Sequence, residues 1–183
     1  GAVLPPVDIV AGGSPCQDLS VAGRRFGIEG ARSGLFFEQI RIIREMRDAD
    51  RKRGRTTQLI RPRWSIWENV PGAYSSGSPP GEDFRVVLEE FVHIVDRSLD
   101  VPRPEAGRWE PAGYILGTGF SLAYRVLDAR HWSVPQRRKR IYLIIDFAGF
   151  TASQILFEPD RVPWDPPPGG ETGQGIAAGA GTG

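Results

Sequence analysis

The sequence predicts an α/β domain whose strands are parallel at first and end in an antiparallel pair. Three observations indicate this class: short apolar runs that stop at glycine or proline, two amphipathic stripes with helical spacing between them, and two β-rich runs flanking a basic turn. The order strand–helix–strand–helix–strand–strand is typical of an α/β sheet. With 183 residues, 40% of them hydrophobic, the chain has room for one domain with a sizeable core.

Each predicted element rests on its periodicity and on the residues that bound it. Glycine and proline close the two early strands, and acidic residues at 82 and 83 favour the start of the second helix. In chain order we expect a buried strand, a helix with a basic exit, a second strand, a polar loop, a second helix, an irregular insertion and two neighbouring strands: Val7–Val10, Phe36–Arg47 with Arg51–Arg55, Trp64–Trp67, Ser75–Gly81, Phe84–Val95, Asp100–Gly113, Ser121–Leu127 and Ile141–Phe147.

Composition limits the class of protein. No apolar run approaches the ~20 residues that cross a bilayer, and a single cysteine excludes an internal disulfide or a multi-cysteine zinc site. We therefore expect a cytoplasmic protein with no membrane and no metal. Residues 1–158 are predicted to form the folded domain. Residues 159–183, of which 12 of 25 are glycine or proline, are predicted to be a linker or disordered tail.

The first candidate site is the loop Gly12-Gly13-Ser14-Pro15-Cys16. In open α/β sheets, chemistry gathers in loops at the carboxyl ends of strands. A lone cysteine is most often a small buried hydrophobe. Here, however, glycines that allow a sharp turn and a stiff proline place Cys16 at a strand tip, where amides or cations would lower the pKa of its thiol.

Two further loops carry charged residues. Glu68 follows an aromatic-rich strand, a setting that favours a raised carboxyl pKa, although an exposed loop glutamate is the simpler interpretation. Arg137-Arg138-Lys139-Arg140 places four cations in one turn before a strand. That run is either a solvated basic turn or a site for an anion.

Taken together, Pro-Cys-Gln, then Glu-Asn-Val, then Gln-x-Arg-x-Arg resemble the DNA cytosine-5 methyltransferase family. Asp18–Gly23, Arg32–Phe37 and Asp128–Gln136 are also similar to that family, with Leu19, Trp132 and Ser133 as departures. The resemblance covers about residues 7–147. It implies a partial Rossmann-like fold that uses S-adenosylmethionine, without the first donor-binding strand, the target-recognition region or the C-terminal motif.

The resemblance also implies roles for individual residues. Cys16 would add to carbon 6 of a cytosine flipped out of the duplex, and Glu68 would protonate or hydrogen-bond ring nitrogen 3. Arg140 would contact the cytosine oxygen and steady Glu68, and Arg138 would lie near the target phosphate. Residues implied on the substrate side are Ser14, Gln17, Ser20, Asn69, Val70 and Gln136, and those on the donor side are Pro15 and Leu35.

These roles imply a monomeric enzyme that methylates double-stranded DNA, in a restriction–modification system, a phage or an orphan setting. Because the chain begins at Gly1 and its sole methionine is Met46, we expect a fragment. Without the first strands of the family's fold the sheet would have unpaired edges and an uncovered apolar face, so we expect this fragment to be inactive or poorly soluble alone. Three alternatives stay open. One is a truncated or degenerate homologue that binds DNA without methylating it, and another is an enzyme acting on transfer RNA. The third is a cysteine hydrolase that pairs Cys16 with His93 or His131.

Overall fold

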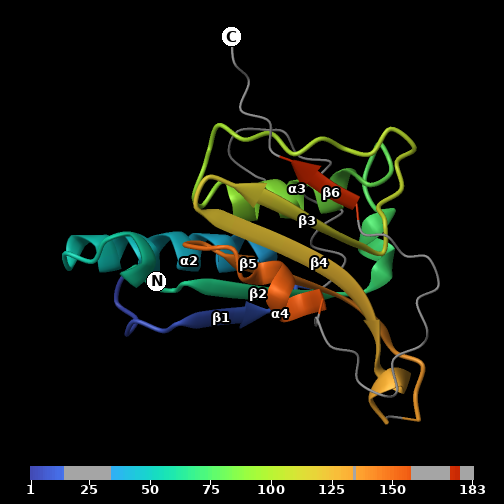
Figure 1. The fold of residues 1–183 in the computed structure, drawn as a ribbon, viewed down its shortest axis with the longest axis horizontal. Helices are drawn as coiled ribbons and strands as arrows, with labels where there is room; N and C mark the ends of the chain where they lie inside the picture. The colour runs from blue at the N-terminus through green and yellow to red at the C-terminus, as the bar shows by residue number, and fades with distance from the viewer. Residues whose placement is uncertain (15–33, 134, 158–173, 178–183) are drawn as a thin grey trace.

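The computed structural model of the chain describes residues 1–14, 34–133, 135–157 and 174–177. These residues build one mixed sheet with strand order β1-β2-β5-β4-β3-β6 and helices on both of its faces (Figure 1). The strands are β1 Ile9–Gly12, β2 Trp64–Asn69, β3 Ala112–Gly117, β4 Phe120–Asp128, β5 Lys139–Asp146 and β6 Gln174–Ala177. The α-helices are α2 Leu35–Lys52, α3 Glu82–Val92 and α4 Ala152–Phe157, and the 3-10 turns are η1 Thr57–Leu59, η2 Pro71–Tyr74 and η3 Ala129–Trp132.

The sheet has the predicted mixed character. β1 and β2 are parallel, β2, β5, β4 and β3 follow one another antiparallel, and β6 returns parallel to β3. The α/β class and the neighbouring antiparallel strands β4 and β5 are thus confirmed. β3, α4 and β6 were not predicted. β6 lies inside the segment expected to be a linker or disordered, so that expectation is wrong for Gln174–Ala177, whereas the division of the chain at residue 158 remains a prediction.

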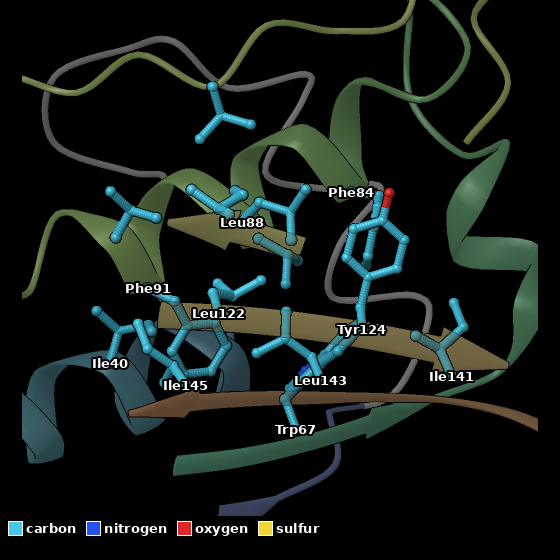
Figure 2. Packing of buried hydrophobic residues seen from close by; sticks show 14 of the residues in the cluster. Ile40, Trp67, Phe84, Leu88, Phe91, Leu122, Tyr124, Ile141, Leu143 and Ile145 are labelled. Carbon is cyan, nitrogen blue, oxygen red and sulfur yellow. The ribbon is translucent and has the colours of Figure 1, made fainter. Parts of the chain in front are cut away.

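The main core lies between the sheet and the two long helices. Apolar side chains at helical spacing on α2 and α3, such as Phe36 and Phe84, pack against Trp67 of β2 and Leu143 of β5. Figure 2 shows Trp67, Leu143 and Tyr124 on the strands, with Leu88 and Phe91 of α3 above them. Each such side chain, once buried, contributes about 1.5–3 kcal/mol. This layer fixes the face of β2 that carries Trp67.

The first strand differs from its prediction. Val7–Val10 was expected to be a buried strand, but β1 spans Ile9–Gly12 and Ile9 is 51% exposed. The difference follows from the alternation of side chains along a strand. Val10 faces the main core, while Ile9 and Ala11 face the opposite side, where the described helix α4 covers β4 and β5 instead.

A buried carboxylate, Asp146, links three segments of the chain by hydrogen bonds. Asp146 at the end of β5 accepts two hydrogen bonds from Arg63, each 3.1 Å, and one from the Thr151 hydroxyl, 2.6 Å. Burial opposes its ionisation, but the Arg63 and Thr151 donors hold the pKa of Asp146 below its usual range. The same residue therefore joins the start of β2, the end of β5 and the start of α4.

A second buried carboxylate has no such partners, and it sets a pH dependence. Asp83 is 1% exposed, and neither of its oxygens has a hydrogen-bond partner in the described structure. Burial raises the pKa of Asp83 above its ordinary value of 3.8, although the nearby Ser76 hydroxyl acts in the opposite direction, and Glu82 adds to the effect of burial. As the pH rises from 3.8 through the raised pKa, the unfolded chain loses this proton first, so the free energy of unfolding falls.

In the variant Asp83→Asn, the free energy of unfolding is expected not to show this fall as the pH rises. Urea unfolding should show the variant to be more stable than the parent chain at pH 8, by about 1 kcal/mol or more, and this difference should shrink as the pH falls towards 3.8. Asp96→Asn is the control, because hydrogen bonds from Ser98 lower the pKa of that exposed carboxyl instead. Equal stability of the parent chain and Asp83→Asn at pH 8 would contradict the assignment.

Candidate active site

Strand direction brings three separate parts of the sequence to one edge of the sheet. β1 and β2 are parallel, so both end at this edge, and β5 begins there because it runs antiparallel to β2. Gly13 and Ser14 follow β1, Glu68 and Asn69 end β2, and Arg140 is the second residue of β5. Glu68 and Asn69 were expected in a loop. They belong to β2 because its pairing with Tyr142 and Ile141 continues to the last residue.

Glu68 and Arg140 form an ion pair at this edge. Arg140 Nε lies 2.8 Å from Glu68 Oε1, and the two side chains keep 21% and 34% of their surface exposed. Arg140 Nη1 also donates to the Lys139 carbonyl at 2.7 Å, which helps to hold the guanidinium in place. A guanidinium donates hydrogen bonds and a carboxyl donates one when it is protonated, so the two groups side by side, both open to solvent, can together bind a planar ring that presents two neighbouring acceptors. The predicted proximity of these two residues is confirmed.

Gly13 packs directly against Glu68. A Cβ atom added at Gly13 would lie 3.1 Å from Glu68 Oε2 and 3.3 Å from the Glu68 carbonyl oxygen, tighter than side chains ordinarily pack. A glycine at this position therefore allows the backbone that leaves β1 to cross close to the carboxylate. The candidate loop and the acid are in contact before the chain reaches Cys16.

Ser14 is buried, with 7% of its surface exposed, and two residues of β2 hold it. The Trp67 indole N–H donates to Ser14 Oγ at 3.2 Å, and the Asn69 amide donates to the Ser14 carbonyl at 3.0 Å. Asn69 Oδ1 in turn accepts from the Val70 amide at 2.8 Å. The resemblance implied a place for Asn69 on the substrate side, and its contact with Val70 lies in the segment that follows Glu68. The structure shows that Asn69 also braces the loop that leads to Cys16.

Trp67 was not singled out from the sequence. It was visible only as one aromatic residue in an apolar strand, and nothing local indicated that its N–H would reach Ser14. The indole is 0% exposed, so this hydrogen bond supplies the partner that a buried donor requires.

The basic turn lies on an arm formed by β4 and β5. Figure 1 shows this hairpin extending past the rest of the sheet, with η3 at its tip. Asp128 Oδ1 closes the arm by accepting the backbone N–H groups of Arg130, at 3.3 Å, and Arg138, at 3.1 Å. Burial opposes ionisation of Asp128, yet these donors lower its pKa. The Gln136 and Arg138 side chains are exposed, and among the described residues the ion pair at Glu68 is made by Arg140 and not by Arg138.

The remaining predicted residues divide into two groups. Pro15, Cys16, Gln17 and Ser20 lie outside the described residues, and their roles stay predictions. Leu35 is the first residue of α2 and is 62% exposed. His93 Nε2 lies 3.0 Å from the Leu99 carbonyl, and this contact closes the turn after α3.

The described residues contain neither a candidate metal site nor a candidate membrane-spanning helix. No group of three or more His, Cys, Asp or Glu side chains within this part of the chain could hold a metal ion. Likewise, none of its helices is both long and apolar enough to span a bilayer.

Comparison with known proteins gives several methyltransferases that are similar to this chain. The chain is 28% identical over 178 residues to the DNA N-6-adenine-methyltransferase of Escherichia phage P1, covering 85% of this chain and 22% of the relative. It is 29% identical over 141 residues to the orphan methyltransferase M.Rho11sI of Bacillus phage rho11s, covering 77% and 20%. It is 32% identical over 161 residues to the type II methyltransferase M2.BsuMI of Bacillus subtilis, covering 86% and 32%.

The chain thus spans between about a fifth and a third of the length of these relatives. The family described as C-5 cytosine-specific DNA methylase matches residues 2–94, about half of the 183 residues. That match contains the strand before Cys16, all of α2 and the Glu-Asn-Val segment of β2. The chain therefore belongs to the C-5 cytosine-specific DNA methylase family.

Proposed function

We propose that this chain supplies the catalytic half of an enzyme that transfers a methyl group from S-adenosylmethionine to carbon 5 of a cytosine flipped out of double-stranded DNA. The observation that carries the proposal is the Glu68–Arg140 ion pair, 2.8 Å long, at the edge where Ser14 leads to Cys16. Family membership supplies the reaction class.

The chemistry requires carbon 5 of cytosine to become nucleophilic. The Cys16 thiolate adds to carbon 6, forming a carbon–sulfur bond and moving an electron pair through the ring towards nitrogen 3. Glu68 gives a proton or a hydrogen bond to nitrogen 3, and Arg140 binds the neighbouring oxygen. Loss of the proton from carbon 5 to solvent water later expels the thiolate, and nitrogen 3 returns its proton to Glu68 as the aromatic ring is restored.

S-adenosylmethionine, when bound, supplies the methyl group as an electrophile. The described residue that fits contact with it is Leu35, an apolar side chain 62% exposed at the first turn of α2. Pro15 is the second residue proposed to contact the donor. We propose that Gln17, Ser20, Val70 and Gln136 contact or position the DNA, and that Arg138 lies near the target phosphate. The proposed setting is a cytoplasmic monomer that acts in restriction–modification or as an orphan enzyme.

A second candidate is a homologue that binds DNA without methylating it. The observation in its favour is the exposed basic turn, where Arg137, Arg138 and Lys139 have no ion-pair partner among the described residues. Phosphate binding needs only such cations. The Glu68–Arg140 pair, which phosphate binding does not need, favours the enzyme.

The test is methyl transfer by the native protein that contains this chain. The protein is incubated with tritiated S-adenosylmethionine and duplex DNA, and the DNA is digested to nucleosides. Label in 5-methylcytosine is the expected result. Label in N6-methyladenine, the product that the name of the phage P1 relative suggests, would contradict the proposed base. DNA retention without label would support the binding protein, and label in transfer RNA alone would identify a different substrate.

A further inference from the structure

We propose that Trp67 is a positioning residue for Cys16, acting through Ser14. The inference rests on the proposed function. The indole ring is 0% exposed and has edge contacts with Phe36 of α2, at a ring distance of 6.3 Å, and lies 6.2 Å from Phe84 of α3. Packing against both helices therefore holds the indole ring in place independently of the loop that follows β1.

The indole N–H of Trp67 donates a hydrogen bond to one acceptor in the segment that follows β1. Trp67 Nε1 donates to Ser14 Oγ at 3.2 Å, and Ser14 is itself buried. A purely packing role could be filled by phenylalanine or leucine, neither of which brings a buried N–H that needs a partner. The tryptophan thus adds one feature to the packing, which is a directed bond to the loop.

A second hydrogen bond, from Asn69, restricts the geometry of Ser14 further. Asn69 lies two residues along β2 from Trp67, on the same face of the strand, and its amide donates to the Ser14 carbonyl at 3.0 Å. One residue thus receives a bond on its side-chain oxygen from Trp67 and a bond on its main-chain oxygen from Asn69. Two bonds of this kind restrict both the position and the orientation of Ser14.

Glu68 lies between these two residues in the sequence and points to the other face, towards Arg140. Ser14 is two residues before Cys16, so the sulfur-bearing residue can lie at most about 7 Å along the chain from the held serine. In this proposal, β2 therefore positions both reacting groups, Cys16 and Glu68. Its residues 67 and 69 hold the loop that leads to Cys16, and its residue 68 presents the acid.

The test compares two variants that break the same bond from opposite ends. Trp67→Phe keeps the ring in the core and removes the donor, whereas Ser14→Ala removes the acceptor and leaves the core intact. In the native protein each is expected to lower kcat for methylation about tenfold, with KM for DNA changed less than about twofold. The double variant should be no slower than either single one, since all three lack the same bond.

A second readout needs neither DNA nor donor. The 183-residue chain has one cysteine, so in the native protein the alkylation of Cys16 by iodoacetamide can be followed on the peptide that contains this residue. In both variants the pH midpoint of alkylation is expected to rise, and the rate at pH 7 to fall about threefold, because the proposal has Ser14 hold the loop that places the thiol near amides or cations, which would lower its pKa. A merely structural role of Trp67 would change thermal unfolding without moving this midpoint in Ser14→Ala.

Trp64→Phe is the matched control. Its indole N–H also makes a hydrogen bond, to the Thr151 hydroxyl at 3.0 Å, but on the opposite face of β2 and away from Ser14. Alkylation and kcat should match the parent protein in this variant. The inference is overturned if Trp67→Phe and Ser14→Ala both behave like Trp64→Phe. If the parent protein does not methylate DNA, but alkylation of Cys16 is still altered in Trp67→Phe and Ser14→Ala, the proposed function is contradicted and the positioning role of Trp67 is supported.

Discussion

Replacement of Cys16 by serine is expected to abolish methyl transfer by the native protein. A serine hydroxyl is a far weaker nucleophile than a thiolate near neutral pH, so addition to carbon 6 would not occur at a useful rate. DNA containing 5-fluorocytosine gives the clearest measurement. Fluorine cannot leave carbon 5 as a proton does, so the parent protein with S-adenosylmethionine should form a covalent complex that survives denaturing electrophoresis, and Cys16→Ser should form none.

Retained DNA binding is the control for this variant. The exposed cations of the arm, such as Arg137 and Lys139, are unchanged by the substitution, so a gel-shift titration should give the same affinity as the parent protein. Covalent complex formation by Cys16→Ser would show that another residue is the nucleophile. Absence of the complex in the parent protein as well would favour the protein that only binds DNA, or a hydrolase.

Replacement of Glu68 by glutamine is expected to lower kcat by about 10²–10⁴-fold, the usual effect of losing a proton-transfer group. Glutamine keeps the size and one acceptor oxygen of the side chain, but it cannot pass a proton to ring nitrogen 3, and it removes the charge that pairs with Arg140. Single-turnover methylation measures the chemical step directly. The covalent complex with 5-fluorocytosine DNA should still form, at a rate reduced in proportion.

Glu82→Gln provides a matched control. Glu82 also pairs with an arginine at 2.8 Å, Arg85 on α3, and is similarly part-exposed, but it lies away from the sheet edge of the site. Both substitutions remove a part-exposed pair worth about 0–1 kcal/mol of stability, so their unfolding midpoints should be alike. A Glu68→Gln enzyme within threefold of the Glu82→Gln enzyme would remove Glu68 from the mechanism.

The parts of the fold with strong periodicity could be predicted from the sequence. α2 and α3 carry apolar residues at every helical turn, and β4 and β5 are long β-rich runs, so their type was evident. β3 was hidden by the glycines at both of its ends. The structure explains them, because a Cβ at Gly113 would overlap the Tyr124 ring and a Cβ at Gly117 would overlap the Phe120 ring of β4. The packing that stabilises the strand requires the residues that concealed it.

The site was predictable to the same degree. Glu68 and Arg140 could be placed together because their motifs border strands and strand ends share an edge. The hydrogen bonds from Trp67 and Asn69 to Ser14 could not be predicted, since they depend on how residues more than 50 positions apart meet in three dimensions. Helix α4, with six residues, was too short to give a periodic signal.

The antiparallel direction of β5 has a consequence for how the site arises during synthesis. Ser14 and the strand that carries Glu68 leave the ribosome early, but the Arg140 guanidinium follows more than 70 residues later and reaches the carboxylate only when β5 inserts between β2 and β4. Long-range pairings of this kind form late in folding. A nascent chain that ends before Lys139 therefore already contains the cysteine and the acid, yet lacks the cation that pairs with the acid.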